Sequence, residues 1–567
     1  MRKKVFLMLA LCLLAQWSVA QSPKWVEKAK RAVFSVVTYD ENDKILNTGN
    51  GFFVTEDGVA LSDYTLFKGA QRAIVMNSEG TQMPVVSIMG ANDMYDVVKF
   101  RVGITSKKVP ALALATVNPP VDATVYILPY STQKDRSYTS GQVKAEDKFS
   151  DKYYYYTLNV HLKDKMVSCP VMTEEGQVFA LTQKSSGKDT ATICYAVDAN
   201  FAMVQAVNAF SFSDMSLKNI GIKKALPDTE ETALVFLYMA SSQLSPEKYF
   251  QLLDDFVAQY PNSADGYVRR ATQQIYVSQD EASIAKVVAD MDKALDVANK
   301  KDDVYYNRAK LIYNYILGQP EKVYKDWSYD KALEEIKKAI AIEELPVYVQ
   351  LEGDIEFAKQ NYAAALVCYE KVNQTNLVSP ATFFSTAKTK ELMKAPVQDV
   401  LALMDSCMSR FTEPYTTEAA PYLLERARVR MDANQARGAI LDYDAYYKAV
   451  KGNVNDVFYY YREQAAMKAK QFQRALDDMA KAIELNPKEL TYYAELAVVN
   501  MRVGRNEAAL KALQDALAID PKYAEAYRLM GIAHLQMKKK QEACENFAKA
   551  KELGDPNVDE LIQKHCK

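Results

Sequence analysis

At 567 residues, the chain exceeds what a single hydrophobic core supports, so we expect two or more domains. Its 70 basic and 72 acidic side chains give a net charge of -2, and we expect no nucleic-acid partner because such a partner requires a basic surface. Hydrophobic residues make up 49% of the chain and charged residues 25%, as in ordinary globular proteins, whereas histidine is scarce at 3 copies.

The first twenty residues have the pattern of a secretory signal peptide. Three basic residues, Arg2 to Lys4, precede an apolar run from Val5 to Ala15. Ser18-Val19-Ala20 is a small-residue cleavage site that leaves Gln21 as the first mature residue. We therefore expect an exported protein, periplasmic in a Gram-negative bacterium or otherwise secreted.

A lipid anchor at Cys12 is the less favoured alternative, because Leu11 precedes it and Cys12 lies inside the apolar run. No later segment reaches the roughly 18 apolar residues that a membrane-spanning helix needs. An exported protein is free to form disulfides. The six remaining cysteines are too few in a chain of this length to indicate a disulfide framework.

Residues 30 to 210 are predicted to form many short strands and almost no helix. The apolar runs are short and rich in β-branched residues, and Asp57-Gly58 is a hairpin turn between two of them. Strands at this spacing favour a barrel or a sandwich. The predicted strands are Arg31–Thr38, the two runs within Gly51–Ser62, Arg72–Met76, Asp96–Val102, Val125–Leu128, Tyr153–Val160, Gln177–Thr182 and Ala191–Val197.

Five blocks in this region resemble HtrA-like, trypsin-fold serine proteases. Gly49–Ala70 (GNGFFVTEDGVALSDYTLFKGA) is similar to the family pattern G-S-G-F-I-I-x-x-D-G-x-I-L-T-N-x-H-V-V-x-x-A. Ser168–Leu181 (SCPVMTEEGQVFAL) is similar to G-G-P-L-x-N-x-x-G-x-V-x-G-I. The other blocks are Asn92–Val102, Thr139–Val143 and Cys194–Val197. The resemblance implies an all-β trypsin-like double barrel over residues 21–210.

The chemistry of that family does not follow from the resemblance. Its mechanism needs a serine, a histidine that takes the serine's proton and an aspartate that orients the histidine. The resemblance places these roles on Thr65 for the histidine, Asp96 for the aspartate and Val167 for the serine, so only the aspartate is present. We therefore expect no catalytic residue and an inactive, protease-like head.

A shift of the alignment by one residue makes Ser168 an alternative nucleophile. The histidine count argues against that reading, because the three histidines are His161, His534 and His565 and none precedes Asp96. A rebuilt site, for example Ser168 with Lys165, is a further alternative. Ser168 and Cys169 replace two glycines of the family, in which the flexible backbone of this loop directs N–H groups at the oxyanion.

Cys169 has three open interpretations. It is a thiol nucleophile without an identified partner, one half of a disulfide with Cys194, or a buried apolar residue.

From about Glu230 to the end, the hydrophobic period is helical and the sequence repeats. Asn486-Pro487 and Asp520-Pro521 lie 34 residues apart, and Asp555-Pro556 follows after 35. This period resembles the tetratricopeptide (TPR) family, in which each unit is a pair of helices. We expect a linker at 211–228 and an all-α TPR solenoid at 229–567, with about nine helix pairs and a terminal capping helix from Asp559.

The first helix of each pair lines the inner groove of such a solenoid. In the last units, the groove is predicted to be mainly apolar, which disfavours the basic clamp that some TPR proteins use for acidic C-terminal tails. The alternative is that these side chains pack against neighbouring repeats. The predicted groove residues are Val457, Tyr460, Met467, Val498, Met501, Arg528 and Ile532.

Cys544 and Cys566 lie on either side of the turn near Asp555, opposite one another in two antiparallel helices. This placement is compatible with a disulfide. The alternative is that Cys544 fills an apolar position of the repeat.

The predicted function is that of an exported, non-catalytic interaction protein whose solenoid binds protein or peptide partners. The sequence has no metal-ligand cluster, phosphate loop or dinucleotide fingerprint, so we expect no cofactor and no metal. The alternatives are a serine endopeptidase with a rearranged active site and a purely structural role in an envelope complex. The sequence does not indicate the partner or the oligomeric state.

Overall fold

The computed structural model describes residues 23–105, 108–132, 138–150, 152–161, 166–184, 193–322 and 324–566. The predicted signal peptide, Cys12 within it and Lys165 lie outside the described residues. The chain divides into two compact units, residues 1–298 and 299–567, which we describe one at a time.

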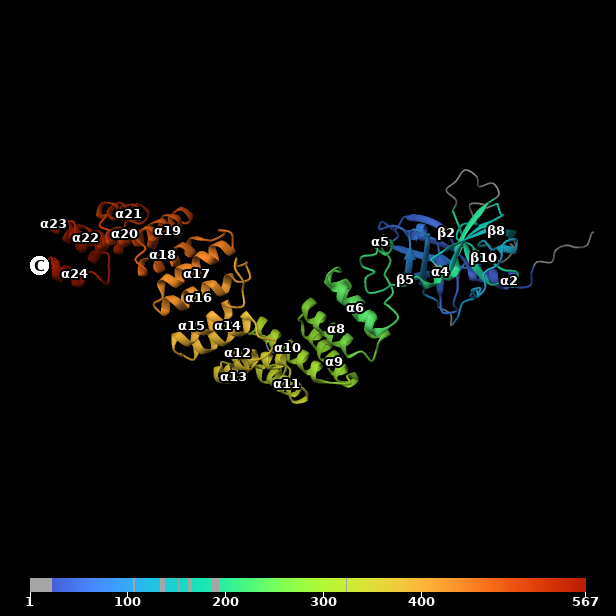
Figure 1. The fold of residues 1–567 in the computed structure, drawn as a ribbon, viewed down its shortest axis with the longest axis horizontal. Helices are drawn as coiled ribbons and strands as arrows, with labels where there is room; N and C mark the ends of the chain where they lie inside the picture. Colours follow the sequence, from blue (N-terminus) through green and yellow to red (C-terminus); the bar gives the residue numbers. More distant parts are fainter. Residues whose placement is uncertain are drawn as a thin grey trace, which may run out of the picture. The chain divides into compact units, whose positions relative to one another are not determined.

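The first unit contains two closed antiparallel barrels of six strands each, which confirms the predicted double barrel (Figure 1). The first has the order β1-β2-β3-β6-β5-β4 and the second β10-β11-β12-β9-β8-β7. The strands are β1 Val33–Tyr39, β2 Ile45–Phe53, β3 Val59–Ser62, β4 Arg72–Met76, β5 Gln82–Asn92, β6 Val97–Val102, β7 Thr124–Ile127, β8 Thr139–Phe149, β9 Tyr153–Leu158, β10 Pro170–Met172, β11 Val178–Gln183 and β12 Cys194–Asp198.

The predicted Asp57-Gly58 turn joins β2 to β3. Gly58 has φ +96, and a Cβ there would lie 2.7 Å from the carbonyl oxygen of Val102, so the turn requires glycine. Val54 N–H donates to the Val59 carbonyl and closes the hairpin at 2.9 Å. This hairpin leads β3 directly into Asp63 and the short helix α3 (Tyr64–Phe67).

One buried apolar cluster contains side chains from both barrels. Val33 and Phe52 come from the first barrel, and Met172, Leu181 and Val197 come from the second. Each of these five side chains is completely buried. The cluster therefore joins the two barrels.

Residues 211–228, predicted as a linker, pack along the first barrel. Gly221 N–H donates to the Ala70 carbonyl at 2.7 Å, and Ile88 N–H donates to the Lys223 carbonyl at 2.8 Å. Ala225 N–H donates a hydrogen bond to the Ile88 carbonyl at 2.8 Å. The segment is therefore part of the head's folded structure.

Within the described residues, the helices α6 to α23 form nine successive pairs, in agreement with the predicted number. The first unit contains α6 Glu230–Ser241, α7 Pro246–Gln259, α8 Ala264–Val277 and α9 Glu281–Val297. The second contains α10 Asp302–Gly318, α11 Tyr329–Ile342, α12 Pro346–Ala358, α13 Tyr362–Val372, α14 Pro380–Leu392, α15 Val397–Met408, α16 Ala420–Asp432, α17 Ala436–Ala449, α18 Asp456–Lys468, α19 Phe472–Leu485, α20 Leu490–Arg502, α21 Asn506–Ile519, α22 Ala524–Gln536, α23 Lys540–Glu552 and the short α24 Asp559–His565.

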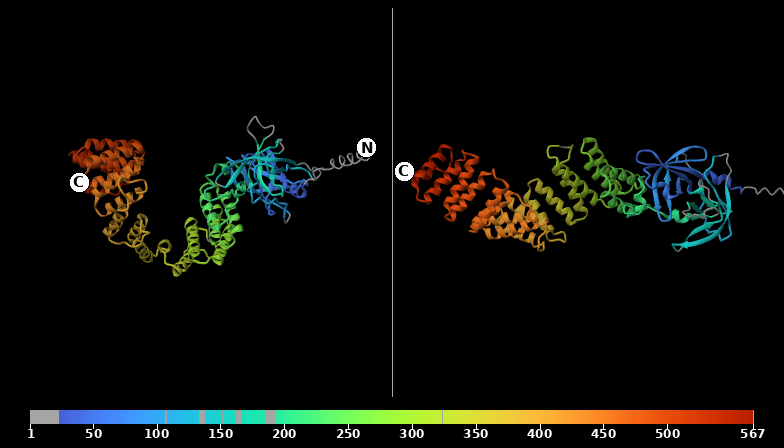
Figure 2. Two further views of the ribbon diagram at one scale, coloured as in Figure 1. Left: turned by 45° about the vertical axis from the view of Figure 1, so that its right-hand side comes forward. Right: turned by 90° about the horizontal axis from the view of Figure 1, so that it is seen from above.

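Small residues let the two helices of a pair approach closely. A Cβ on Gly531 in α22 would lie 2.4 Å from the ring of Phe547 in α23, and one on Gly353 in α12 would lie 2.9 Å from Tyr369 in α13. Several helices begin at a serine cap, as at Ser379, whose side chain accepts from Thr382 N–H before α14. Both views of Figure 2 show the helices of residues 299–567 stacked in pairs. No helix among the described residues has the length and apolarity to cross a membrane.

Candidate functional site

The position that the family gives to its catalytic histidine is occupied by the exposed Thr65 in α3. Asp96, at the position of the aspartate, lies between β5 and β6 with φ +49. Its carboxylate accepts a 2.7 Å hydrogen bond from the backbone N–H of Thr65. The carboxylate that would orient an imidazole therefore binds the first turn of α3, where a helix has unpaired N–H groups.

The loop before β10 has a backbone that favours glycine at Ser168. This residue has φ +61, in the left-handed region where side chains are disfavoured. The geometry favours the alignment in which Ser168 replaces the first glycine and Val167 replaces the serine. The Val167 carbonyl accepts a 2.7 Å hydrogen bond from the Asn50 side chain.

The Ser168 side chain is completely buried, and its hydroxyl lies against the Asp63 carboxyl without a hydrogen bond of regular geometry. The loop is fixed to β11, because Ser168 N–H donates to the Thr182 carbonyl at 2.9 Å. The Thr182 hydroxyl adds a bond to the Met166 carbonyl at 2.5 Å and accepts from Cys169 N–H at 2.9 Å. A peptide bound at the surface does not reach the Ser168 hydroxyl in this conformation.

Asp63 is a site residue that the sequence reasoning missed. It follows β3, is 2% exposed and interacts with Ser168, and its Oδ1 has no hydrogen-bond partner in the described structure. Burial, and to a lesser degree the charge of Asp96, raise the pKa of the Asp63 carboxyl well above its usual range. An acidic residue between two apolar runs, Val59–Leu61 and Tyr64–Phe67, was the available signal.

Asp63→Asn is expected to match the wild type in thermal stability near the ordinary pKa of an aspartate carboxyl and to become the more stable protein as the pH rises, because the raised pKa shows that the site favours a neutral side chain. The carboxyl's folded-state pKa exceeds its unfolded value, so the wild-type chain loses stability as the pH rises above the unfolded pKa. The variant should lack that loss. Circular dichroism melts of both proteins across this pH range measure the difference, and parallel pH profiles would contradict the assignment.

The two cysteines near the loop are buried thiols without a disulfide. Burial raises the pKa of Cys194 to about 12 and raises that of Cys169 well above its usual range. A thiol must ionise to act as a nucleophile, so neither environment favours that role. His161 is exposed at the start of the segment that leads to the loop.

The predicted groove residues of the last repeats are largely packed between helices. Met501 in α20 is 8% exposed, whereas Val457 at the start of α18 is 41% exposed. The other apolar members are partly buried against two core clusters, which matches the alternative that they pack against neighbouring repeats. These members are Tyr460, Met467, Val498 and Ile532.

Arg528, the charged member of the predicted groove, is held in ion pairs. It contacts Asp555 at 2.9 Å and Glu525 at 2.6 Å. Asp555 is 3% exposed, so Arg528 compensates a buried charge at the turn before α24.

A recurring arrangement, which we call the arginine staple, joins three consecutive helices. An arginine on the first helix of a pair binds a buried aspartate on the second helix and a more exposed aspartate on the preceding helix. Arg462 in α18 binds Asp478 in α19 at 2.6 Å and Asp444 in α17 at 3.1 Å. Further staples are Asp254–Arg270–Asp290 and Asp405–Arg426–Asp442, and Arg430 in α16 also binds both aspartates of the latter.

The sequence comparisons agree with both parts of this architecture. The profile of a family described as "Trypsin-like peptidase domain" matches residues 49–181. A second, described as "TPR repeat", matches residues 502–538. The chain joins a trypsin-like domain to TPR repeats.

Three curated relatives match short segments of the chain, between 15% and 18% of its length. The "Small glutamine-rich tetratricopeptide repeat-containing protein 2" of Mycosarcoma maydis is 35% identical over 99 residues, 18% of this chain and 28% of that protein. The human "DnaJ homolog subfamily C member 7" is 30% identical over 16% of this chain and 18% of its own length. The mouse "Tetratricopeptide repeat protein 28" is 39% identical over 15% of this chain and 3% of its own length. The chain thus spans less than a third of each of these relatives.

Two neighbouring carboxyl groups, those of Glu463 in α18 and Glu495 in α20, lie between these TPR helices. Glu463 is completely buried, and the equivalent positions of the next two repeats, 34 and 68 residues later, hold the small residues Ala497 and Gly531. Burial raises the pKa of Glu463 to about 8, and the charge of Glu495 adds to the effect. Gln464 donates to Glu463 at 2.7 Å.

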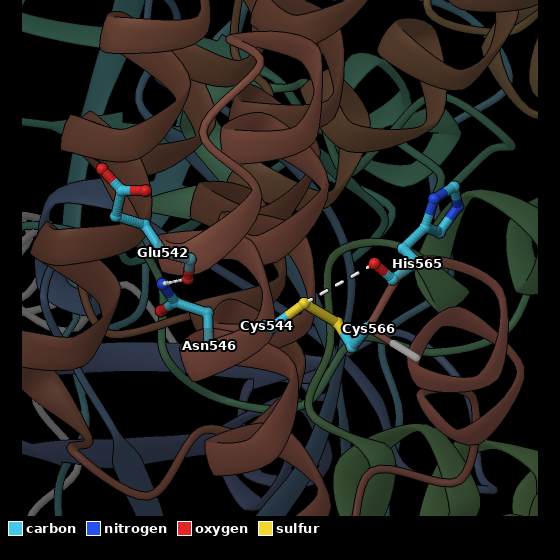
Figure 3. The surroundings of a disulfide bond; sticks show 5 residues. All are labelled: Glu542, Cys544, Asn546, His565 and Cys566. Carbon is cyan, nitrogen blue, oxygen red and sulfur yellow. Dashed lines mark hydrogen bonds between the residues drawn. A yellow bond between two sulfur atoms is a disulfide. The ribbon is translucent and has the colours of Figure 1, made fainter.

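A disulfide joins Cys544 in the TPR helix α23 to Cys566 after α24, with 5.6 Å between the Cα atoms (Figure 3). None of the residues of α24 is fully buried. Leu561 and Ile562 pack only partly against the cluster of Phe547 and Val558. The disulfide is therefore the strongest attachment of the capping helix.

Reduction of this disulfide is expected to loosen α24 selectively. A bridge across a sequence separation of 22 residues contributes about 3 kcal/mol in the chain-entropy description. Hydrogen exchange of peptides covering 553–566 should accelerate after reduction, while peptides from α20 change little. The paired substitutions Cys544→Ala and Cys566→Ala give a control that reductant should not affect. Equal protection of α24 before and after reduction would contradict the attachment.

The described residues contain no group of three or more His, Cys, Asp or Glu side chains that could hold a metal ion.

Proposed function

We propose that this protein is an exported, non-catalytic interaction protein in which the TPR array binds protein or peptide partners and the trypsin-like domain does not cleave them. The observation that carries the proposal is that the Asp96 carboxylate binds the backbone N–H of Thr65, the residue at the family's histidine position, while Ser168 is completely buried. The proposal is further supported by Thr65 at the family's histidine position, because a threonine cannot act as the general base for a serine.

The array supports the binding half of the proposal. Stacked helix pairs present an extended surface that suits long protein or peptide segments. The TPR family model matches residues 502–538 within the array, and curated relatives with TPR in their names are similar to the chain over short segments.

Export is supported by the signal-peptide pattern of residues 1–20 and by the Cys544–Cys566 disulfide, since disulfides persist in oxidising compartments. N-terminal sequencing of the protein from a periplasmic or culture-medium fraction tests this part. A start at Gln21 is expected, and a start at Met1 would overturn it.

We expect the purified protein to leave casein intact and to resist labelling by a fluorophosphonate probe that labels active trypsin in the same experiment. The Ser168→Ala variant is the matched control. Labelling that requires Ser168 would establish the alternative, a serine endopeptidase with a rearranged site. Co-purification from envelope extracts with the full chain then separates the two non-catalytic roles. A stable envelope complex would indicate a purely structural role, and its absence would favour peptide binding.

A further inference from the structure

A cavity of about 360 Å³ lies beside the trypsin-like domain, between residues 211–224 and the helices α6 and α7. This volume is at the lower end of the range for small-molecule sites. Its apolar wall includes Phe212 and Phe236, whose rings stack at 4.6 Å, together with Leu217, Ile222 and Leu252. The last four of these side chains are less than 9% exposed. The wall therefore favours the apolar body of a ligand.

The lining also contains four lysines and a single acidic residue. Lys223 forms an ion pair with that residue, Asp255. The other three, Lys218, Lys224 and Lys248, have no ion pair within the described residues. The cavity consequently carries an excess of positive charge next to an apolar wall.

Lys224 is the most enclosed of these lysines. Its ammonium donates to the carbonyl oxygens of Ile220 at 2.5 Å and Ile222 at 2.6 Å. An ammonium has three N–H donors, so one is left for a ligand at the cavity. Burial without a compensating anion lowers the pKa of Lys224 to about 8, a cost that a bound anion would offset.

We propose that this cavity binds a monoanion with an apolar body, a carboxylate whose head contacts Lys224 and whose chain lies against Phe212, Phe236 and Leu252. The Lys224 ammonium provides a point charge that suits the compact head of a carboxylate, and the apolar wall suits the chain attached to it. Free fatty acids and the C-terminus of an apolar peptide share this chemistry.

Isothermal titration calorimetry of the full chain with decanoate tests the proposal. Decanoate should bind, whereas decanol lacks the charge and acetate lacks the chain, so both should bind at least about tenfold more weakly. A tripeptide ending in leucine, with a free or an amidated C-terminus, identifies the source. Tighter binding of the free peptide than of decanoate favours a chain end, and the reverse favours a fatty acid.

Two variants assign the binding to this cavity. Lys224→Met should weaken decanoate binding at least about tenfold, and Gln251→Trp should block it by filling the cavity from an exposed lining position. Lys44→Met, on the exposed turn after β1, is the matched control and should bind normally. Circular dichroism verifies folding, and Gln251→Trp keeps the test decisive if Lys224→Met unfolds. The absence of decanoate binding, equal binding of decanol, or unchanged binding in both cavity variants would overturn the proposal.

Discussion

Replacing Arg462 with methionine is expected to lower the local free energy of unfolding around α18 and α19 by about 3–5 kcal/mol. Asp478 is 2% exposed and binds Arg462 through two hydrogen bonds, at 2.6 and 3.0 Å. Without the guanidinium, the carboxylate stays buried and uncompensated. Burial already raises the pKa of Asp478, and the arginine opposes that rise, so the defect should diminish at low pH, where the carboxyl takes up a proton.

Hydrogen exchange measures this effect locally, which suits a chain of several domains that does not unfold in one step. Peptides from α18 and α19 should lose protection in Arg462→Met and regain most of it when Asp478→Leu is added. Lys481→Met is the control, since its ion pair with Glu484 is exposed and contributes at most about 1 kcal/mol. A loss no larger than that of the control would refute the staple's role.

Glu463→Gln is expected to stabilise the TPR array increasingly as the pH rises from about 4.5 to 8. The folded-state pKa of about 8 exceeds the ordinary value of 4.5, so the native state binds more protons than the unfolded state throughout this window. The free energy of unfolding of the wild type therefore falls as the pH rises through the window, by roughly 1.4 kcal/mol for each pH unit and by up to about 5 kcal/mol in all. Glutamine has the same shape and no charge, so the variant should lose less stability.

Melting curves followed by circular dichroism at pH 5, 6.5 and 8 provide the measurement. The two proteins should melt alike at pH 5 and diverge at pH 8, with the variant more stable. Glu484→Gln, in the exposed pair with Lys481, should follow the wild-type profile. A constant difference between Glu463→Gln and wild type at all three values would show that Glu463 is not the titrating group.

The repeated helical pattern predicted the helix pairs, and the repeated strand pattern predicted a barrel or a sandwich. The resemblance to trypsin-fold proteases then implied the two barrels. The sequence missed β5, where Pro84 and bulges next to Ser87 and Gly90 interrupt the alternation of apolar and polar residues. It indicated only the first residues of β8, because that strand carries the charged and largely exposed segment Lys144–Lys148. Strand pairing determines both elements, and it depends on residues distant in the sequence.

The environment of the candidate site could be predicted only in part from the sequence. The sequence placed Thr65, Asp96 and Val167 at the family's positions. The bond from Thr65 to Asp96 and the burial of Ser168 beside Asp63 depend on how the two barrels pack. The staples had a sequence signal that was overlooked, because Arg426 and Arg462 each precede their buried aspartate by 16 residues.

The staples also determine how the array should come apart. Asp405, Arg426 and Asp442 connect α15, α16 and α17, and Asp444 and Arg462 continue the connection to α18 and α19. In a repeat protein, the coupling between neighbours decides whether units open singly or together. Strong coupling across five successive helices makes this stretch one cooperative block, whose amides should exchange with a common opening free energy while helices outside it open independently.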